Sequence, residues 1–448
     1  MTDLIGPVRQ DQEGDADRAR KKSPPTPDEQ RSALVRLVAV LAAAALATVV
    51  TGTTKTVLVV VALIAMIMLH ELGHYLTAKW GGMKVTEFFV GFGPRLWSVR
   101  RGETEYGVKA LPLGGYVKII GMHNLDPVDD PADEPRTYRQ QSFGRRLSVA
   151  VAGSTMHFII AFLLFFGVNA FVGVPMPSTT IGVMDAIEGQ ASPAQEAGLR
   201  VGDKVVAIDG EPIEDWDDLR STISARPGEP TPMTVERDGE RIDLSATPID
   251  LSQVRVDGKV VTTEKRGFLG IGPTEEYRTT DPLTAVGRSA KQWVGGDFSG
   301  VEDVSPGLVD NAKALASIAS PSGASSLWTN ITGGEDGQGD PDGVRFLSPV
   351  GFVRVAGQAA DNSLFAVMGL LIAINLFVGI FNLLPLLPLD GGHVAIAVYE
   401  AIRSKIAGRR YAADVAKLMP LTYAVVLLMV FLGVSALYLD IVRPLNFR

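Results

Sequence analysis

The chain has 448 residues and no cysteine, and its formal net charge is −8. It is too long for one ordinary domain, and the lack of cysteine excludes disulfides and cysteine-ligated zinc sites, so histidine and carboxylate side chains are left as metal ligands. Although 46% of the residues are hydrophobic and 21% are charged, these averages conceal an alternation of very apolar and very polar stretches.

Five apolar stretches each have close to the roughly 20 residues that a helix needs to cross the hydrocarbon core of a bilayer. They run over Leu34–Val50, Val57–Ala78, Leu147–Val174, Leu364–Leu384 and Pro420–Leu439. For the first, which is the shortest and is rich in alanine, an interfacial helix or a signal-like segment is the alternative. Because the preceding tail is long and polar and no clear cleavage site follows, we interpret it as a retained span.

The charged side chains gather in particular loops. Residues 79–146 and 403–417 are rich in Lys and Arg, as is the N-terminal tail, whereas acidic residues predominate between positions 173 and 362. The positive-inside rule therefore places the tail and the two basic loops in the cytoplasm and the acidic region outside. This arrangement requires all five spans.

The motif His70-Glu71-Leu72-Gly73-His74 closes the second apolar stretch. On a helix, His70 and His74 project from one face and can bind one zinc ion. Glu71 can then act as the general base for attack by water at the metal. A pair of structural core histidines is the alternative, but ionisable side chains within a membrane span are costly and are usually functional.

Three short β-prone runs follow this motif. They cover Val85–Val90, Arg95–Arg101 and Thr104–Leu111, and are separated by turns that contain glycine or proline. We predict a β-meander against the membrane face, with an ordinary cytosolic sheet as the alternative.

The external segment Ile181–Asp250 has the pattern of a small α+β domain. We expect a strand at Thr180–Met184, a hairpin turn at Asp209-Gly210 and a helix over Trp216–Ile223. The order Pro-Ala-x-x-Ala-Gly-Leu-x-x-Gly-Asp followed by Val-Val-x-Ile-Asp-Gly resembles bacterial PDZ domains. Such domains bind extended peptide termini along a strand edge, and the resemblance implies that this edge is Ile181–Val183.

A third metal ligand is predicted where the fourth apolar stretch ends. Pro385 and Pro388 must break the helix that begins near Leu364, which leaves unwound backbone at membrane depth, and Asp390 follows directly. A carboxylate at such a position is a functional candidate. The second and fourth spans both run from outside to inside, so both deliver their polar groups to the cytoplasmic half of the bilayer. Asp390 is the preferred third ligand, and His393 is the alternative.

The HELGH motif, the PDZ-like segment and the broken span that leads to Asp390 together resemble the bacterial site-2 proteases of the RseP class. The resemblance covers Val57–Leu439 and implies that a zinc ion is held by His70, His74 and Asp390, that Glu71 is the base, and that Asn382 holds the substrate backbone. It also implies that the substrates are transmembrane segments of single-pass membrane proteins, such as anti-sigma factors, after a first protease has shortened them. A metal-binding membrane transporter or sensor is the alternative, although a transporter has no evident need for Glu71.

The third apolar stretch departs from the family pattern. Where the family usually has Gly-Pro-x-x-Asn-Phe, this chain has Gly153-Ser-Thr-Met-His157-Phe158. A histidine within a span needs a polar partner. We expect His157 to pair with a neighbouring backbone carbonyl, and a hydrogen bond near the active site is the alternative.

The expected fold is a polytopic α-helical membrane protein of the bacterial plasma membrane, in contact with the lipid bilayer, with an inserted α+β PDZ-like extracytoplasmic domain and a short membrane-associated β-meander. We expect no nucleic-acid partner. In chain order the predicted parts are a disordered cytoplasmic tail (1–32), an additional transmembrane helix (33–51), the transmembrane helix with the HELGH motif (52–80), the cytoplasmic-side β-loop (81–146), a transmembrane helix (147–174), the PDZ-like domain (175–250), an extracytoplasmic linker with an amphipathic segment (251–362), the broken transmembrane helix (363–393), a cytoplasmic loop (394–419) and a last transmembrane helix (420–440).

Overall fold

The computed structural model of the chain describes residues 27–122, 126–185, 192–256, 259–260, 262–295, 305–318, 320–332 and 347–442. The chain separates into two compact units, of which the first comprises Met1–Phe166 and Gly287–Arg448 and the second Gly167–Val286. Most of the tail predicted as 1–32 lies outside the described residues, although its last residues belong to the first helix, α2 (Pro27–Thr51).

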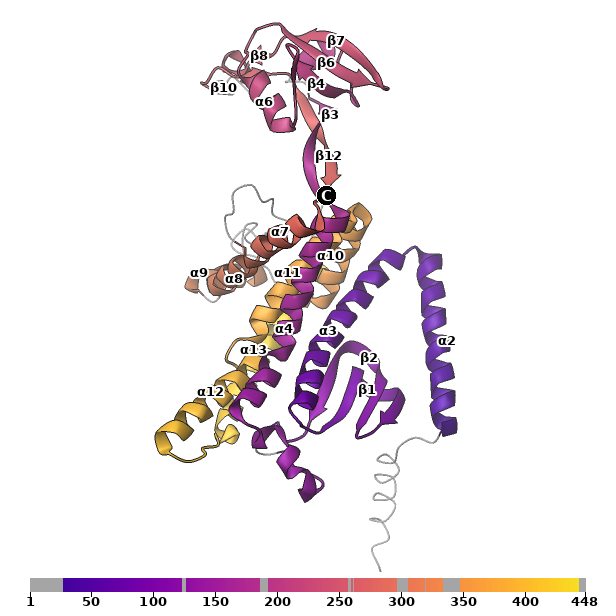
Figure 1. Ribbon diagram of the computed structural model, residues 1–448, viewed down its shortest axis with the longest axis vertical. Helices are drawn as coiled ribbons and strands as arrows, with labels where there is room; N and C mark the ends of the chain where they lie inside the picture. Colours follow the sequence, from indigo (N-terminus) through magenta and orange to yellow (C-terminus); the bar gives the residue numbers. More distant parts are fainter. Residues whose placement is uncertain are drawn as a thin grey trace, which may run out of the picture. The chain divides into compact units, whose positions relative to one another are not determined.

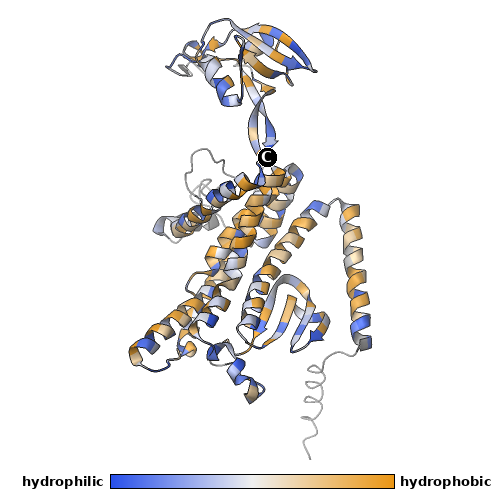
Figure 2. Cartoon of the chain, in the orientation of Figure 1, coloured by the Kyte–Doolittle hydropathy of each residue, from blue (hydrophilic) through white to orange (hydrophobic). Residues whose placement is uncertain are grey.

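Within the described residues, five helices are long and apolar enough to cross a membrane. They are Gln30–Thr51 of α2, α3 (Thr54–Trp80), α4 (Phe143–Gly167) continued by η3 (Val168–Val172), α11 (Leu364–Asn382), and η5 (Val415–Leu418) continued by α13 (Met419–Val442). Figure 2 shows that these helices are predominantly apolar along their length, as lipid-facing helices must be. The prediction of a multi-pass membrane protein is confirmed.

The spans approach one another closely at glycine. A Cβ added to Gly73 of α3 would lie 2.8 Å from the Ala152 carbonyl oxygen of α4. A Cβ added to Gly379 of α11 would lie 2.6 Å from the Phe158 ring of α4. Helix α4 therefore contacts both α3 and α11 at a distance that only glycine allows, as is common between helices in membranes.

The segment predicted as an extracytoplasmic linker, 251–362, contains more structure than expected. Its helices are α7 (Pro282–Val294), α8 (Leu308–Ile318), α9 (Pro321–Thr332) and α10 (Pro349–Asn362). Helix α10 packs against α3, α11 and α13 and buries Val355 and Ala356 (Figure 1). It is therefore part of the packed helical unit, because its apolar face is covered by the neighbouring spans.

The strands β1 (Val85–Arg101) and β2 (Thr104–Ile119) form one antiparallel pair in which both strands bend. Residues 85–90 have partners on both sides, in 105–108 and in 115–119, whereas 95–101 pair with 104–109. The predicted β-runs are present, but a meander is wrong, because the first run does not pair with the second. Gly91 and Gly93, with φ of 83° and 84°, allow β1 to bend between these runs.

The turn of this hairpin is attached to the first unit by charged hydrogen bonds. Glu103 accepts hydrogen bonds from Arg136 Nη2 at 2.9 Å and from Lys79 Nζ at 2.5 Å. These bonds, that from Arg136 most strongly, lower the pKa of the Glu103 carboxyl to about 2. Because β1 and β2 also contact α3, the hairpin is held against the helix that carries the HELGH motif.

The second unit is built on a sheet of order β12-β3-β4-β6-β7, with β5 beside β4. Its apolar core includes Ile181, Val205 and Leu219, all fully buried. The predicted hairpin turn is confirmed, since Asp209 and Gly210 have φ of 52° and 81°, as a type I′ turn requires. The elements named here are β3 (Val174–Met184), α5 (Pro193–Glu196), β4 (Lys204–Ile208), β5 (Glu211–Pro212), α6 (Trp216–Ser224), β6 (Thr231–Arg237), β7 (Glu240–Ala246) and β12 (Ile271–Arg278).

This unit extends beyond the predicted range 175–250. Strand β12 pairs with β3 from Val174, opposite Arg278, to Met184, opposite Ile271. On its other side, Ile181 exchanges backbone hydrogen bonds of 2.8 Å with Gly202 and Asp203. Ile181 is thus flanked on both sides, and β12 is the strand at that end of the sheet. A free edge at Ile181–Val183, as the sequence predicted, is wrong.

The remaining elements are short, apart from one helix. They are η1 (Pro131–Arg136), η2 (Tyr138–Gln140), β8 (Ile249–Asp250), η4 (Leu251–Gln253), β9 (Arg255–Val256), β10 (Lys259–Val260), β11 (Gly267–Phe268) and the longer α12 (Asp390–Ala407).

Candidate active site

The HELGH motif lies near the end of α3, where its two histidines share one face. Both side chains are buried, and their Nε2 atoms are 3.2 Å apart. The imidazole rings meet edge to face, with centroids separated by 4.8 Å. The four-residue spacing therefore brings two ligand nitrogens to one point, as the sequence predicts.

Asp390 reaches the same point from the other end of the chain. Helix α11 ends at Asn382, the chain turns through the two prolines, and α12 begins at Asp390. The Oδ2 atom of Asp390 lies 3.4 Å from His70 Nε2 and 3.2 Å from His74 Nε2. The predicted break in the helix thus presents the carboxylate to the histidines.

Two glycines after Asp390 shape this turn. A Cβ on Gly392 would lie 2.7 Å from the Leu387 backbone nitrogen, and one on Gly391 would collide with the Leu383 and Leu384 carbonyl groups. Any side chain at these positions would push the first turn of α12 away from the unwound segment. The glycines therefore set the position of Asp390.

The three groups fit a zinc ion. A tetrahedral zinc with ligand distances of about 2.0–2.1 Å separates its ligand atoms by about 3.3 Å, and the three atoms here are 3.2–3.4 Å apart. Among the described residues, His70, His74 and Asp390 form the group whose ligand atoms lie close enough together to hold one metal ion. Two neutral imidazoles and one carboxylate are ordinary ligands of a catalytic zinc.

The surroundings of His74 orient it as a ligand. Its Nδ1 lies 2.8 Å from the Val149 carbonyl oxygen of α4. Since a carbonyl only accepts, Nδ1 carries the proton and Nε2 is left to bind a metal. Gly153, one turn further along α4, has its Cα so close that an added Cβ would lie 2.5 Å from the Nε2 atoms of both His70 and His74.

Glu71 points to the β-hairpin. One carboxylate oxygen, Oε2, accepts a hydrogen bond of 3.0 Å from the Val117 backbone nitrogen of β2. Close packing supports this contact, because a Cβ on the neighbouring Gly115 would collide with Met68 of α3. The hairpin therefore orients Glu71 beside the metal ligands without using both of its oxygens.

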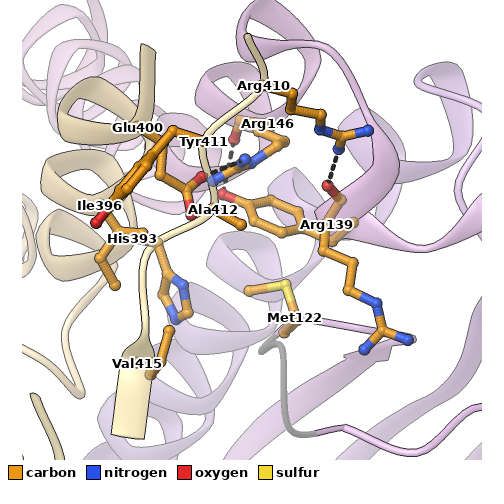
Figure 3. A pocket seen from close by; sticks show the side chains of 11 residues that line it. Met122, Arg139, Arg146, His393, Ile396, Glu400, Arg410, Tyr411, Ala412 and Val415 are labelled. Carbon is orange, nitrogen blue, oxygen red and sulfur yellow. Dashed lines mark hydrogen bonds and ion pairs between the residues drawn. The ribbon is translucent and has the colours of Figure 1, made fainter. Parts of the chain in front are cut away.

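The other candidate residues lie around this centre. Asn382, half-buried at the end of α11, makes no hydrogen bond through its side chain to any described residue. His393 is not part of the ligand cluster and instead lines a separate recess (Figure 3). Its ring lies edge to face with that of Tyr138, at 6.2 Å.

His157 takes the alternative that the sequence disfavoured. Its Nδ1 lies 3.0 Å from Asn375 Oδ1 of α11, and the Asn375 amide donates to the Leu371 carbonyl oxygen at 2.7 Å. The His157 ring is 5.0 Å from that of His70. The expected pairing with a backbone carbonyl is wrong. An asparagine in the middle of an apolar span was the available signal for this contact.

The comparisons with known proteins agree with this geometry. Residues 58–429 match the model of a family described as Peptidase family M50. The chain is a member of peptidase family M50. It is 33% identical over 411 residues to the zinc metalloprotease Rip1 of Mycolicibacterium smegmatis, covering 85% of this chain and 95% of that protein. Over 408 residues it is 34% identical to the zinc metalloprotease Rip1 of Mycobacterium tuberculosis, with the same coverage.

Membership confirms the resemblance to site-2 proteases. This M50 peptidase is a zinc-dependent metalloendopeptidase of the membrane. The alternative of a metal transporter or sensor is not favoured, since the similarity to metalloproteases covers most of the chain.

Proposed function

We propose that this M50 peptidase cleaves transmembrane segments of single-pass membrane proteins, such as anti-sigma factors that a first protease has already shortened. The observation that carries the proposal is the convergence of His70, His74 and Asp390 at 3.2–3.4 Å. The two histidines lie on α3, which is able to cross a membrane, and Asp390 follows the end of α11, which is also able to cross one. A hydrolytic centre at membrane depth reaches peptide bonds that lie within the bilayer, which a soluble protease does not.

Each residue of the centre has a separate task. His70, His74 and Asp390 would hold a zinc ion, which when bound would supply Lewis-acid polarisation of the scissile carbonyl and acidify a water molecule. Glu71, held by Val117, accepts the proton of the attacking water and transfers it to the leaving amine.

Asn382 is proposed to bind the substrate backbone. The family resemblance suggests this task, and two local observations support it. The side chain has no hydrogen-bonded partner among the described residues, and it directly precedes the unwound segment that leads to Asp390. Its amide can therefore donate to and accept from an extended peptide, which must leave its helical hydrogen bonds before it is cleaved.

The Gly167–Val286 unit is proposed to be a PDZ-like gate on the external side. Its motif order and its sheet with α5 and α6 support the assignment. Because Ile181 is flanked on both sides, we place the peptide-binding edge on β12, which is preceded by Gly267-Phe268-Leu269-Gly270. A peptide terminus exposed by a first cleavage would add to that edge.

The substitution Glu71→Gln tests the proposed chemistry. It removes the base but keeps the three ligands, so we expect unchanged zinc content and a loss of cleavage of about 10²–10⁴-fold. Zinc is measured by atomic absorption, and cleavage with a transmembrane substrate in reconstituted vesicles. Cleavage by Glu71→Gln at the wild-type rate would show that the mechanism is wrong.

A further inference from the structure

A polar recess of about 30 Å³ lies among basic segments that the positive-inside rule places on the cytoplasmic side, and none of the three proposed metal ligands lines it. It forms where η2, the start of α4, α12 and the chain after α12 meet (Figure 3). Among the described residues that line it, three arginines and a histidine accompany a single acidic side chain: Arg139, Arg146, Arg410, His393 and Glu400.

The one acidic group in the recess is already neutralised. Glu400 pairs with Arg146 at 2.6 Å and also accepts a hydrogen bond of 2.6 Å from the Ala413 backbone nitrogen. Arg139 pairs with Glu134 at 2.6 Å. Because Arg139 and Arg146 are each paired with a glutamate, the positive charge of Arg410 is the arginine charge in the recess that no described acidic side chain balances.

Arg410 is held only by neutral oxygens among the described residues. It donates to Gln140 Oε1 at 2.9 Å. It also donates to the Arg139 carbonyl oxygen at 2.5 Å (Figure 3). The segments 138–146 and 400–417 together carry eight basic and two acidic side chains. This region therefore attracts anions.

An apolar groove of about 380 Å³ adjoins the recess and shares Ile396 and Tyr411 with it. Its volume is in the range of small-molecule sites. Its other apolar walls are Pro385, Leu387, Ala395, Leu418 and Leu421. The groove thus lies between α12 and the start of the last span, and one of its walls is the segment that leads to Asp390.

We propose that the recess and the groove together bind one anionic phospholipid of the cytoplasmic leaflet. The phosphate would lie beside Arg410, and an acyl chain would fill the groove. A free phosphate would leave the apolar groove unused, and a zwitterionic lipid would bring a cation of its own to a region of positive charge. Basic pockets at the cytoplasmic ends of spans bind anionic head groups in this way. The bound chain would pack on the outer side of the unwound segment that positions Asp390.

The test uses the full chain, purified in a neutral detergent. It is titrated with phosphatidylglycerol and with phosphatidylcholine of the same acyl chains, and bound lipid is counted by native mass spectrometry. We expect a preference for phosphatidylglycerol. Arg410→Gln should weaken phosphatidylglycerol binding about fivefold, the effect of one cation near a membrane surface, whereas Arg410→Lys should retain it.

A matched control separates the recess from diffuse charge. Arg409 is exposed and lines neither the recess nor the groove, so Arg409→Gln removes the same charge one residue away and should leave binding unchanged. In the groove, Ala395→Leu should weaken lipid binding, whereas Ala407→Leu, at an exposed position of the same helix, should not.

Three results would overturn the proposal. Equal binding of the two lipids would show that the head group is not recognised. Equal losses of phosphatidylglycerol binding in Arg410→Gln and Arg409→Gln would show that general surface charge, and not a defined site, attracts the lipid. Displacement of phosphatidylglycerol by inorganic phosphate, with Ala395→Leu binding as the wild type does, would show a small-anion site.

Discussion

The helices of the proposed metal centre and the hairpin turns of the Gly167–Val286 unit use glycine for different reasons. Gly153 and Gly392 lie in helices, and an added Cβ at either would come within 2.7 Å of another group. In the turns of the unit, Gly210 and Gly239 have φ of 81° and 86° and open space where a Cβ would be. Glycine permits close approach at the first two positions and a turn conformation at the other two.

This comparison indicates which positions of the chain tolerate substitution without loss of zinc binding. The proposed metal ligands come from segments more than 300 residues apart, so their distances depend on helices that touch at glycine. The second unit combines local hairpins, such as β6–β7, with one long-range strand pair, β3–β12, over an apolar core. We therefore expect small added groups to damage zinc binding at the first region, while changes in the second leave the chemistry intact.

The largest effect is expected for Asp390→Ala. Two imidazoles alone leave the site without its third ligand, and since loss of a group that only supports a ligand costs 10–100-fold, zinc affinity should fall by more than about a hundredfold. Zinc content and cleavage of a reconstituted substrate measure this. His393→Ala is the control, because His393 lines the recess instead. Zinc retained in Asp390→Ala but lost in His393→Ala would transfer the ligand role to His393.

The second-largest effect on zinc affinity is expected from a substitution that adds only a methyl group. In Gly153→Ala the new methyl group would lie 2.5 Å from the Nε2 atoms of His70 and His74, so α4 or the histidines must move, and zinc affinity should fall about 10–100-fold. Gly144→Ala adds the same methyl group to α4 where nothing lies within 4 Å. It should bind zinc as the wild type does. Equal affinities in the two variants would contradict the role of close packing.

The features that the sequence predicts are those set by local residue patterns, and the features that it misses are contacts between distant segments. The five spans, the pairing of His70 with His74 and the Asp209-Gly210 turn are predictable, because each depends on hydropathy or on residues near one another in the chain. Asp390 is far from the histidines in the chain, and its place beside them is expected from the break in the fourth span and from the family resemblance. The contacts of Glu71 with Val117 and of His74 with Val149 are not predictable. They join segments whose approach is set by side-chain packing, for which a single sequence carries no local signal.

The two strand errors both concern pairing partners. The meander assumed that neighbouring strands in the chain pair with each other, and the strand edge at Ile181–Val183 came from the resemblance to PDZ domains. In the structure 85–90 pairs with 115–119, and β3 pairs with β12, about 90 residues later. Long-range pairing competes with local pairing on equal terms once a bend is allowed, and period-two patterns do not report which partner is chosen.

Removal of the second unit should change selectivity and leave chemistry intact. Val174 pairs with Arg278, and a Cβ on Gly173 would lie 3.0 Å from the Arg278 nitrogen, so a short Gly-Ser link can replace Val174–Arg278. We expect wild-type zinc content and increased cleavage of substrates that keep their external domain, measured against pre-shortened substrate. Unchanged discrimination between the two substrates would contradict the gate.

The smallest effect is on the stability of the second unit, and it depends on pH. The buried Asp203 accepts two hydrogen bonds from Arg237, at 2.7 and 2.8 Å, and one from the Arg200 backbone nitrogen at 2.8 Å. The bonds from Arg237 hold the pKa of Asp203 below its usual value. The stabilisation is therefore fully present above the unfolded pKa of about 3.9, and it is lost as the pH falls through the lower folded pKa.

Arg237→Gln should thus destabilise the unit by about 1–3 kcal/mol at neutral pH, and the difference from wild type should shrink below about pH 4, where protonation of Asp203 removes the charge in both proteins. Hydrogen exchange of β4 and β6 in the full chain measures this. Arg241→Gln, an exposed position on β7 without an ion pair among the described residues, should have little effect. Because neither residue belongs to the zinc centre, both variants should keep wild-type zinc content. A loss of zinc in Arg237→Gln alone would show that the two regions are coupled, and would contradict the independence of the proposed metal centre from the second unit.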